Sequence, residues 1–136
     1  MSICKRIFPV TEDREFSTIS VFQDWLEKKC KKERNGKFRL WSKVGLGDYN
    51  NSTGSLWIFR FQGRLIGEGV VAEDIIDNDD SSPELYAINF QPDSIKIYSN
   101  QVYAEDVKLP SGKDIVRRGI ILSDEDYEYL KKEIGE

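Results

Sequence analysis

The spacing of apolar residues predicts a helix over Ser20–Arg34. Its apolar stripe has three- and four-residue spacing and consists of Ile19, Phe22, Trp25, Leu26 and Cys30. Ser20 and Gln23, three residues apart, form a capping box at the predicted start. Asn35-Gly36 predicts the end, because glycine suits the left-handed position that follows many helices.

The central segment "SLWIFRFQGRLIGEGVVAED" predicts a hairpin. Leu56–Phe61 reads as a strand, Gln62-Gly63 as a two-residue turn and Arg64–Glu73 as the return strand. The outgoing strand is apolar on both faces, with Trp57, Phe59 and Phe61 on one face and Leu56 and Ile58 on the other. Such a strand is covered on both sides, and we expect the first helix to cover one of them.

Short strands with turns between them fill the rest of the chain. They are predicted over Lys37–Val44, Leu85–Phe90, Ser94–Ser99, Gln101–Asp106 and Ile115–Ser123. Ser123 paired with Asp126 predicts the start of a last helix over Asp124–Ile134. This order predicts one α+β domain over residues 1–136, built as a small, curled, mostly antiparallel β-barrel with an N-terminal and a C-terminal helix.

The composition is that of a globular protein, with 136 residues, 39% hydrophobic and 32% charged. No apolar run approaches the ~20 residues of a membrane span. The first residues lack the apolar core of a secretory signal, so we expect a cytoplasmic protein with no membrane contact. In that compartment Cys4 and Cys30 are expected to be thiols rather than a disulfide.

Charge is distributed unevenly along the chain, although the net charge is only −4. Bases dominate residues 28–43 and acids dominate residues 73–84. Charge runs are usually solvated surface, but a local basic face also attracts an anionic partner. Histidine is absent, which excludes Ser–His and Cys–His nucleophiles and most zinc sites. We therefore expect no cofactor, no metal and no catalytic residue.

Residues 40–109 resemble the small β-barrel modules of the PUA-like superfamily, which includes the ASCH and EVE groups. The resemblance lies in "LWIFRFQGRLIGEGVV", with its "GxGxV"-like Gly67–Val71, and in "LYAINFQPDSIKIY". "NQVYAEDV" (100–107) resembles the segment that follows the barrel strands when such modules accompany restriction nucleases. The resemblance implies binding of RNA, or of a modified base in nucleic acid, by holding a flipped base in a pocket near the first barrel strands.

Two groups of residues are the candidates for such binding. The pocket candidates combine an aromatic wall with amides that read a base edge, and they are Trp41, Lys43, Tyr49, Asn50 and Asn51. The candidates for contact with the nucleic-acid backbone are basic, and they are Lys28, Lys32, Lys37, Arg39, Arg60 and Arg64. The alternative is that Trp41 belongs to the core, the asparagines shape a turn and the bases are solvated.

Two other kinds of function stay open. A protein-interaction domain of a prokaryotic system would use the acidic segment and the acidic last helix to cover a basic partner. A metal-dependent nuclease would use Asp93, Asp106 and Lys108, which follow a PD…DxK pattern. A calcium loop over Asp77, Asp79 and Asp80 is disfavoured, because it lacks the glycine and the bidentate glutamate that such loops need.

Overall fold

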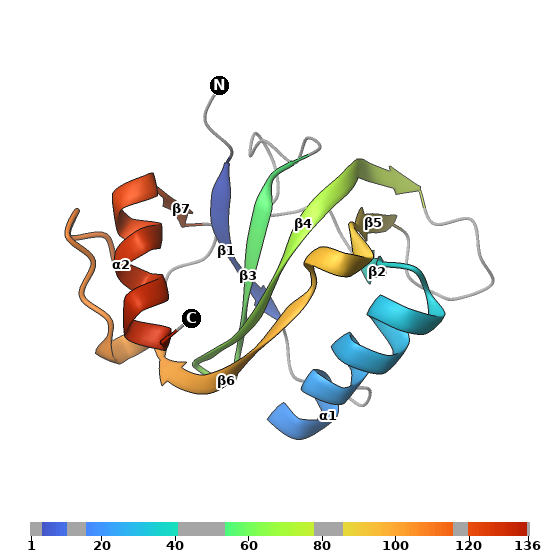
Figure 1. Ribbon diagram of the computed structural model, residues 1–136, viewed down its shortest axis with the longest axis horizontal. Helices are drawn as coiled ribbons and strands as arrows, with labels where there is room; N and C mark the ends of the chain where they lie inside the picture. The colour runs from blue at the N-terminus through green and yellow to red at the C-terminus, as the bar shows by residue number, and fades with distance from the viewer. Residues whose placement is uncertain (1–3, 11–15, 41–53, 78–85, 116–119, 136) are drawn as a thin grey trace.

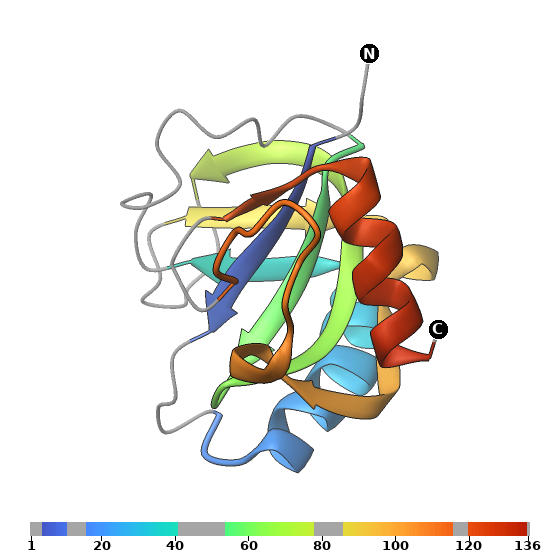
Figure 2. The same ribbon diagram turned by 90° about the vertical axis from the view of Figure 1, so that its left-hand side faces the viewer.

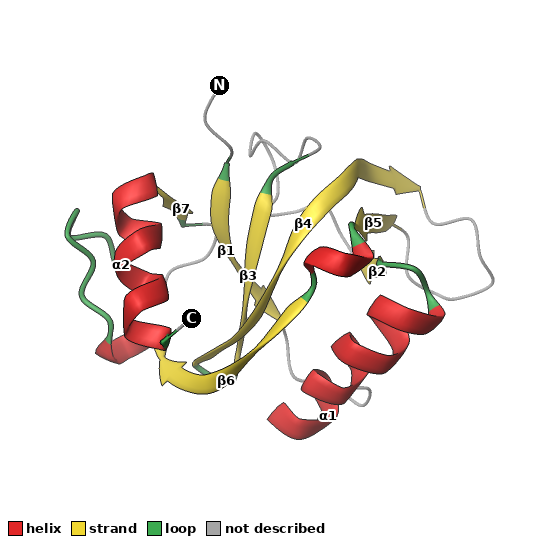
Figure 3. Ribbon diagram, viewed as in Figure 1, coloured by secondary structure: helices red, strands yellow, loops and turns green. Residues whose placement is uncertain are grey.

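The computed structural model describes residues 4–10, 16–40, 54–77, 86–115 and 120–135, without the side chains of 39–40 and 74–77. Strands and two helical segments alternate with short 3₁₀ turns (Figures 1 and 3). The elements are β1 (Lys5–Val10), α1 (Ile19–Asp24), η1 (Trp25–Glu33), β2 (Lys37–Leu40), β3 (Leu56–Phe61), β4 (Arg64–Asp77), β5 (Tyr86–Phe90), η2 (Pro92–Ser94), β6 (Lys96–Tyr103), η3 (Ala104–Asp106), β7 (Ile121–Leu122) and α2 (Asp124–Ile134). The α+β class expected from the sequence is therefore confirmed.

The strands form one seven-stranded sheet in the order β2-β5-β4-β3-β1-β7, with β6 paired to β4. Only the β1–β3 pair is parallel among the described ladders. The long β4 organises the sheet, because its first half pairs with β6 and its second half with β5. At Gly67 a Cβ atom would lie 2.5 Å from the carbonyl oxygen of Lys96, so this close approach of β4 and β6 requires glycine.

The sheet is curled and open rather than a closed barrel. Its curl brings the rings of Phe8 on β1 and Phe38 on β2 to 6.1 Å between centroids. No ladder joins these two strands in the described part of the chain, since β1 already uses one edge for β3 and the other for β7. The sheet is therefore not the closed β-barrel that the sequence predicted.

Side chains of β3 enter two separate cores, as its double apolar pattern predicted. Trp57, Phe59 and Phe61 lie on the inner face of the curl and pack with Phe22 and Trp25 of the first helix. The opposite, outer face carries a second core of β3, β6 and α2 residues, which includes Leu56, Ile58, Tyr98, Leu130 and Ile134. Figure 2 shows the two helical elements on opposite sides of the sheet.

The first helix covers the predicted segment but begins and winds differently. Thr18, not Ser20, is its N-cap, and the Thr18 hydroxyl accepts a hydrogen bond from the amide of Val21. From Trp25 the chain continues as a nine-residue π-helix. Asn35 and Gly36 end it with φ angles of 52° and 92°, in the left-handed region that the sequence predicted.

Strand β1 was not predicted, because proline usually interrupts a ladder. Its place in the sheet explains why Pro9 is tolerated. The amide of Ile7 points toward β7 and donates to the carbonyl oxygen of Ile120 at 2.9 Å. Pro9, two residues later, faces the same edge beyond the last residue pair that β7 makes, so no ladder bond between described residues depends on its missing N–H.

The other boundaries differ by small amounts. The predicted turn at Gln62-Gly63 has positive φ at both residues, as a two-residue hairpin requires. The return strand β4 runs on to Asp77, four residues beyond its predicted end at Glu73. The segments Ser94–Ser99 and Gln101–Asp106 join into the single strand β6, followed by the short turn η3. Helix α2 has the predicted bounds, and Ser123 caps it.

Both cysteines are free thiols, and they differ in burial. Cys30 is fully buried, and burial raises the pKa of its thiol from 9.0 to about 12, against the opposing charge of Arg34.

Because the thiolate is the reactive form, we expect iodoacetamide at pH 8 to alkylate Cys4 in the native protein and Cys30 only after denaturation. Peptide mass spectrometry measures both. Native labelling of Cys30 as fast as that of Cys4 would contradict the burial of this helix.

Candidate nucleic-acid interface

The predicted pocket residues Trp41, Lys43, Tyr49, Asn50 and Asn51 lie outside the described residues. The described elements that flank this segment are β2, which ends at Leu40, and β3, which begins at Leu56. The role of the five residues therefore stays a prediction. What the structure does describe is the set of side chains on the inner sheet face at the start of β3.

A buried arginine lies there beside a tryptophan. Arg6 on β1 is opposite Trp57 in register, is only 1% exposed, and has its guanidinium carbon 5.1 Å from the Trp57 ring centroid. Phe8 stacks on the same indole at 4.5 Å. The indole Nε1 of Trp57 is buried and makes no hydrogen bond with the described residues. Sequence reasoning missed Arg6, although its alternation with Phe8 in "KRIFPV" was the available signal.

The first helix carries a basic outer face. Lys28, Lys29 and Lys32 are exposed, whereas Lys31 leans toward η2 and donates to the carbonyl oxygen of Ile95 at 3.5 Å. The Arg34 guanidinium covers the Trp25 ring at 5.5 Å. The exposed lysines are the part of this face that a phosphate can reach.

Two of these lysines each form an ion pair with a carboxylate of the same helix. Lys28 lies 3.5 Å from a carboxylate oxygen of Asp24, and Lys32 lies 3.5 Å from one of Glu27. The second pair is five residues apart, a spacing that faces the same way in a π-helix and not in an α-helix. Such exposed pairs are weak and salt-sensitive, so both ammonium groups stay available to an anion.

The predicted backbone contacts are divided between the two sheet faces. Arg60 follows Ile58 on the outer face and donates from Nη1 to the carbonyl oxygen of Ile115 at 3.2 Å. Arg64 is paired with Phe61 and lies on the inner side, the side of the first helix. Lys37 begins β2 beside that helix, and Arg39 follows it on the same strand, paired with Ala87. Arg60 is thus separated from Lys28, Lys32 and Arg64.

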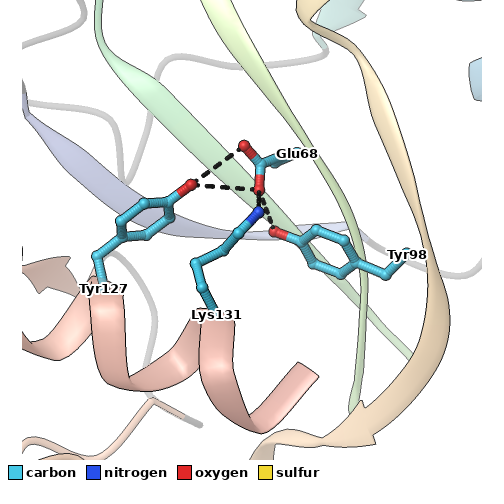
Figure 4. A network of polar contacts seen from close by, with 4 residues as sticks. All are labelled: Glu68, Tyr98, Tyr127 and Lys131. Atoms are coloured by element: carbon cyan, nitrogen blue, oxygen red, sulfur yellow. Dashed lines mark hydrogen bonds and ion pairs between the residues drawn. The ribbon is translucent and has the colours of Figure 1, made fainter. Parts of the chain in front are cut away.

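A buried polar cluster joins α2 to the outer sheet face (Figure 4). Glu68 on β4 accepts hydrogen bonds from the hydroxyls of Tyr98, at 2.8 Å, and Tyr127, at 3.2 Å, and its carboxylate lies 2.5 Å from the ammonium nitrogen of Lys131. Burial, followed by the charge of Glu68 and its hydrogen bond, raises the pKa of Tyr127 well above its ordinary value of 10.0. The tyrosine therefore remains a donor at neutral pH. With its oxygens occupied in this way, Glu68 acts as an anchor for α2.

The nuclease pattern does not assemble into a metal centre. Asp93 lies in η2 and Asp106 ends η3, and the eight-residue strand β6 separates these two turns. At about 3.3 Å per residue such a strand holds them far apart. The described residues contain no group of three acids, cysteines or histidines placed to hold a metal ion. Of the calcium-loop candidates, Asp77 ends β4, and Asp79 and Asp80 lie outside the described residues.

No protein-family model and no curated protein matches the sequence, but solved structures share its fold. One is the YTH domain of the Zygosaccharomyces rouxii MRB1 protein in complex with N6-methyladenosine RNA. It aligns with 97% of this chain and 86% of its own, at a TM-score of 0.60 and 12% identity. Protein Atu2648 from Agrobacterium tumefaciens aligns over 97% and 93%, at a TM-score of 0.63 and 11% identity. At these identities the likeness establishes the fold alone.

Membrane insertion through a helix finds no support in the described part of the chain. None of its helices combines the length and the apolar character that a membrane span requires.

The contributions of Glu68 and Lys131 to stability should be coupled, because the two side chains form one ion pair. Glu68→Gln leaves the Lys131 ammonium, on a side chain only 15% exposed, without its counter-charge, and we expect the free energy of unfolding to fall by about 3 kcal/mol. Urea denaturation measures the loss. Lys131→Met should cost a similar amount, while the double variant Glu68→Gln/Lys131→Met should recover part of it because no unpaired charge remains. Strictly additive losses in the double variant would show that the pair is not coupled.

Proposed function

We propose that the protein is a non-catalytic nucleic-acid-binding module of PUA-like form that reads a modified or flipped base. The observation that carries the proposal is the alignment of 97% of this chain with a domain solved in complex with N6-methyladenosine RNA. The curled sheet with a helix against its inner face agrees with the PUA-like architecture implied by the central motifs. Folds host many functions, so the residues of the site carry the rest of the argument.

The base-reading pocket in this proposal consists of Trp41, Lys43, Tyr49, Asn50 and Asn51. An indole provides a stacking surface for any base, and amide side chains supply both a donor and an acceptor for its edge. Support comes from the described flank, where Arg6 and Trp57 bring a cation and an aromatic ring together at the start of β3.

The backbone of the strand is proposed to follow the basic face of the first helix. Lys28 and Lys32 are exposed there, and their carboxylate partners at 3.5 Å are exchangeable for phosphates. Arg64 extends the set on the inner face of the sheet, and Lys37 and Arg39 on β2 are its further proposed members. Arg60 is a weaker member of the set, because its guanidinium is engaged with a carbonyl oxygen on the outer side.

Fluorescence polarisation against labelled RNA and DNA, with and without modified bases, tests the proposed pocket. We expect binding that prefers one modification, and we expect Trp41→Ala to lose both that preference and about 1–3 kcal/mol of binding free energy. Glu133→Ala is the control, because Glu133 is exposed on α2, away from the first helix. Absence of binding at about 100 μM protein in low salt would rule out the nucleic-acid function, since even non-specific binders reach about 10⁻⁴–10⁻⁶ M.

The salt dependence of binding tests the backbone contacts separately. The slope of log K against log salt is negative, and each lost phosphate contact reduces its magnitude by about 0.7 for a single strand. The double variant Lys28→Gln/Lys32→Gln should therefore reduce the magnitude by about 1.4. Lys132→Gln removes an exposed cation from α2 and should leave the slope unchanged. Equal slopes for all three proteins would exclude the helix face as the path of the strand.

A further inference from the structure

An arginine and a tyrosine form a stacked pair near the tip of the β3–β4 hairpin. Arg64 begins β4, and Tyr103 is its partner in the ladder with β6. The guanidinium carbon lies 4.6 Å from the centroid of the Tyr103 ring. Tyr103 is 42% exposed, one of the few large hydrophobic side chains in the described chain with so much surface in water. The pair therefore offers an aromatic ring and a cation at one accessible point.

The guanidinium is held in a defined orientation. Its Nη1 donates to Oε1 of Gln101 at 3.0 Å, and its Nη2 donates to the Tyr103 hydroxyl. Arginine has five N–H donors, and the other three donate to no described residue. An oriented guanidinium with free donors is suited to bidentate contact with a phosphate, because less side-chain entropy is lost on binding.

The pair lies on the side of the molecule that carries the proposed interface. Arg64 is opposite Phe61, whose ring belongs to the inner core. At the hairpin tip, the Gln62 amide nitrogen donates to the carbonyl oxygen of Ser17, just before the first helix begins. The hairpin tip thus adjoins the N-terminal end of the helix that bears Lys28 and Lys32. A strand bound along that helix has a continuation toward Arg64 and Tyr103.

We propose that Arg64, Gln101 and Tyr103 form a platform for one unpaired nucleotide of the bound strand. This inference rests on the proposed nucleic-acid function and narrows its ligand to a single-stranded segment. The free donors of Arg64 bind the phosphate, and the exposed ring of Tyr103 stacks on the base. A base inside a duplex is already stacked on its neighbours and is unavailable to the ring, so the platform discriminates against duplex.

An abasic scan of a single-stranded oligonucleotide tests the platform. The probe is a fluorescent strand of about ten nucleotides in which one base at a time is removed, measured by polarisation. At one position outside the modified base, we expect removal of the base to weaken wild-type binding about 5- to 100-fold. Tyr103→Ala should weaken binding of the intact strand by the same factor. The affinity of this variant should not change further when the base at that position is removed.

Three further variants separate stacking from the phosphate contact. Tyr103→Phe keeps the ring and should retain sensitivity to base removal. Arg64→Lys keeps the charge but loses the fork, so we expect weaker binding with an unchanged salt slope. Lys132→Gln, which changes an exposed residue of α2 on the outer side of the sheet, should bind as wild type does. Circular dichroism confirms that each variant is folded.

The outcomes distinguish this inference from the proposed function. Wild-type binding with no sensitive position, or Tyr103→Ala binding the strand as wild type does, would overturn the platform and leave the module's function standing. Equal affinity of the wild type for single strands and duplexes would also overturn it. No binding of any strand by the wild type would instead refute the proposed function itself.

Discussion

The rest of the structure depends on the burial of β3 on both of its faces. Because side chains alternate along a strand, its rings point inward and Leu56 and Ile58 point outward. Each face then needs a cover that removes it from water. The first helix packs against the inner face and α2 against the outer face, so the two helices occupy opposite sides of the sheet (Figure 1). The charges they carry are separated in the same way.

This separation gives the molecule two sides with different chemistry. The exposed lysines of η1 lie on the inner side, and the first turn of α2 exposes the acids Asp124 and Glu125. Such an arrangement attracts an anionic partner to the first side rather than to the second. The net charge of −4 conceals this arrangement, because the sum contains no information on position.

The attachment of α2 combines an apolar layer with one buried ion pair. Leu130 and Ile134 enter the outer core, while Glu68 and Lys131 meet beside it together with two tyrosine hydroxyls. Removing a charged pair from water is costly, so the cluster adds less to stability than its short contacts suggest. Its stronger effect is on position, since a helix shifted along the sheet would leave a buried charge without a partner.

Local patterns predicted the elements whose signals lie within a few residues. The stripe of Phe22 and Trp25, the turn at Gln62-Gly63 and the cap at Ser123 all appear where the sequence indicated. Strand β1 was not predicted, and the alternation of its residues is a weak signal because its proline argues against a ladder until the position of β7 is known. The π-helical winding from Trp25 to Glu33 was not predicted.

The candidate site was less predictable than the fold. A two-residue turn implies that Arg60 and Arg64 face opposite ways, and the structure bears this out, yet both were assigned to one surface. Arg6 and Tyr103 become noteworthy only through neighbours distant in sequence, Trp57 for the first and Arg64 for the second. The role of the segment that contains Trp41 stays a prediction from residue type.

The central claim is that nucleic acid binds the inner side of the molecule and not the side of α2. Nuclear magnetic resonance of the ¹⁵N-labelled protein, during titration with a single-stranded oligonucleotide that carries a modified base, tests this account most directly. The account predicts that amide shifts change along η1 and at Arg64 and Tyr103 on the inner side, and also in the segment 41–53, while those of α2 stay unchanged. Changes concentrated on α2 and the outer face, with η1 unaffected, would contradict it.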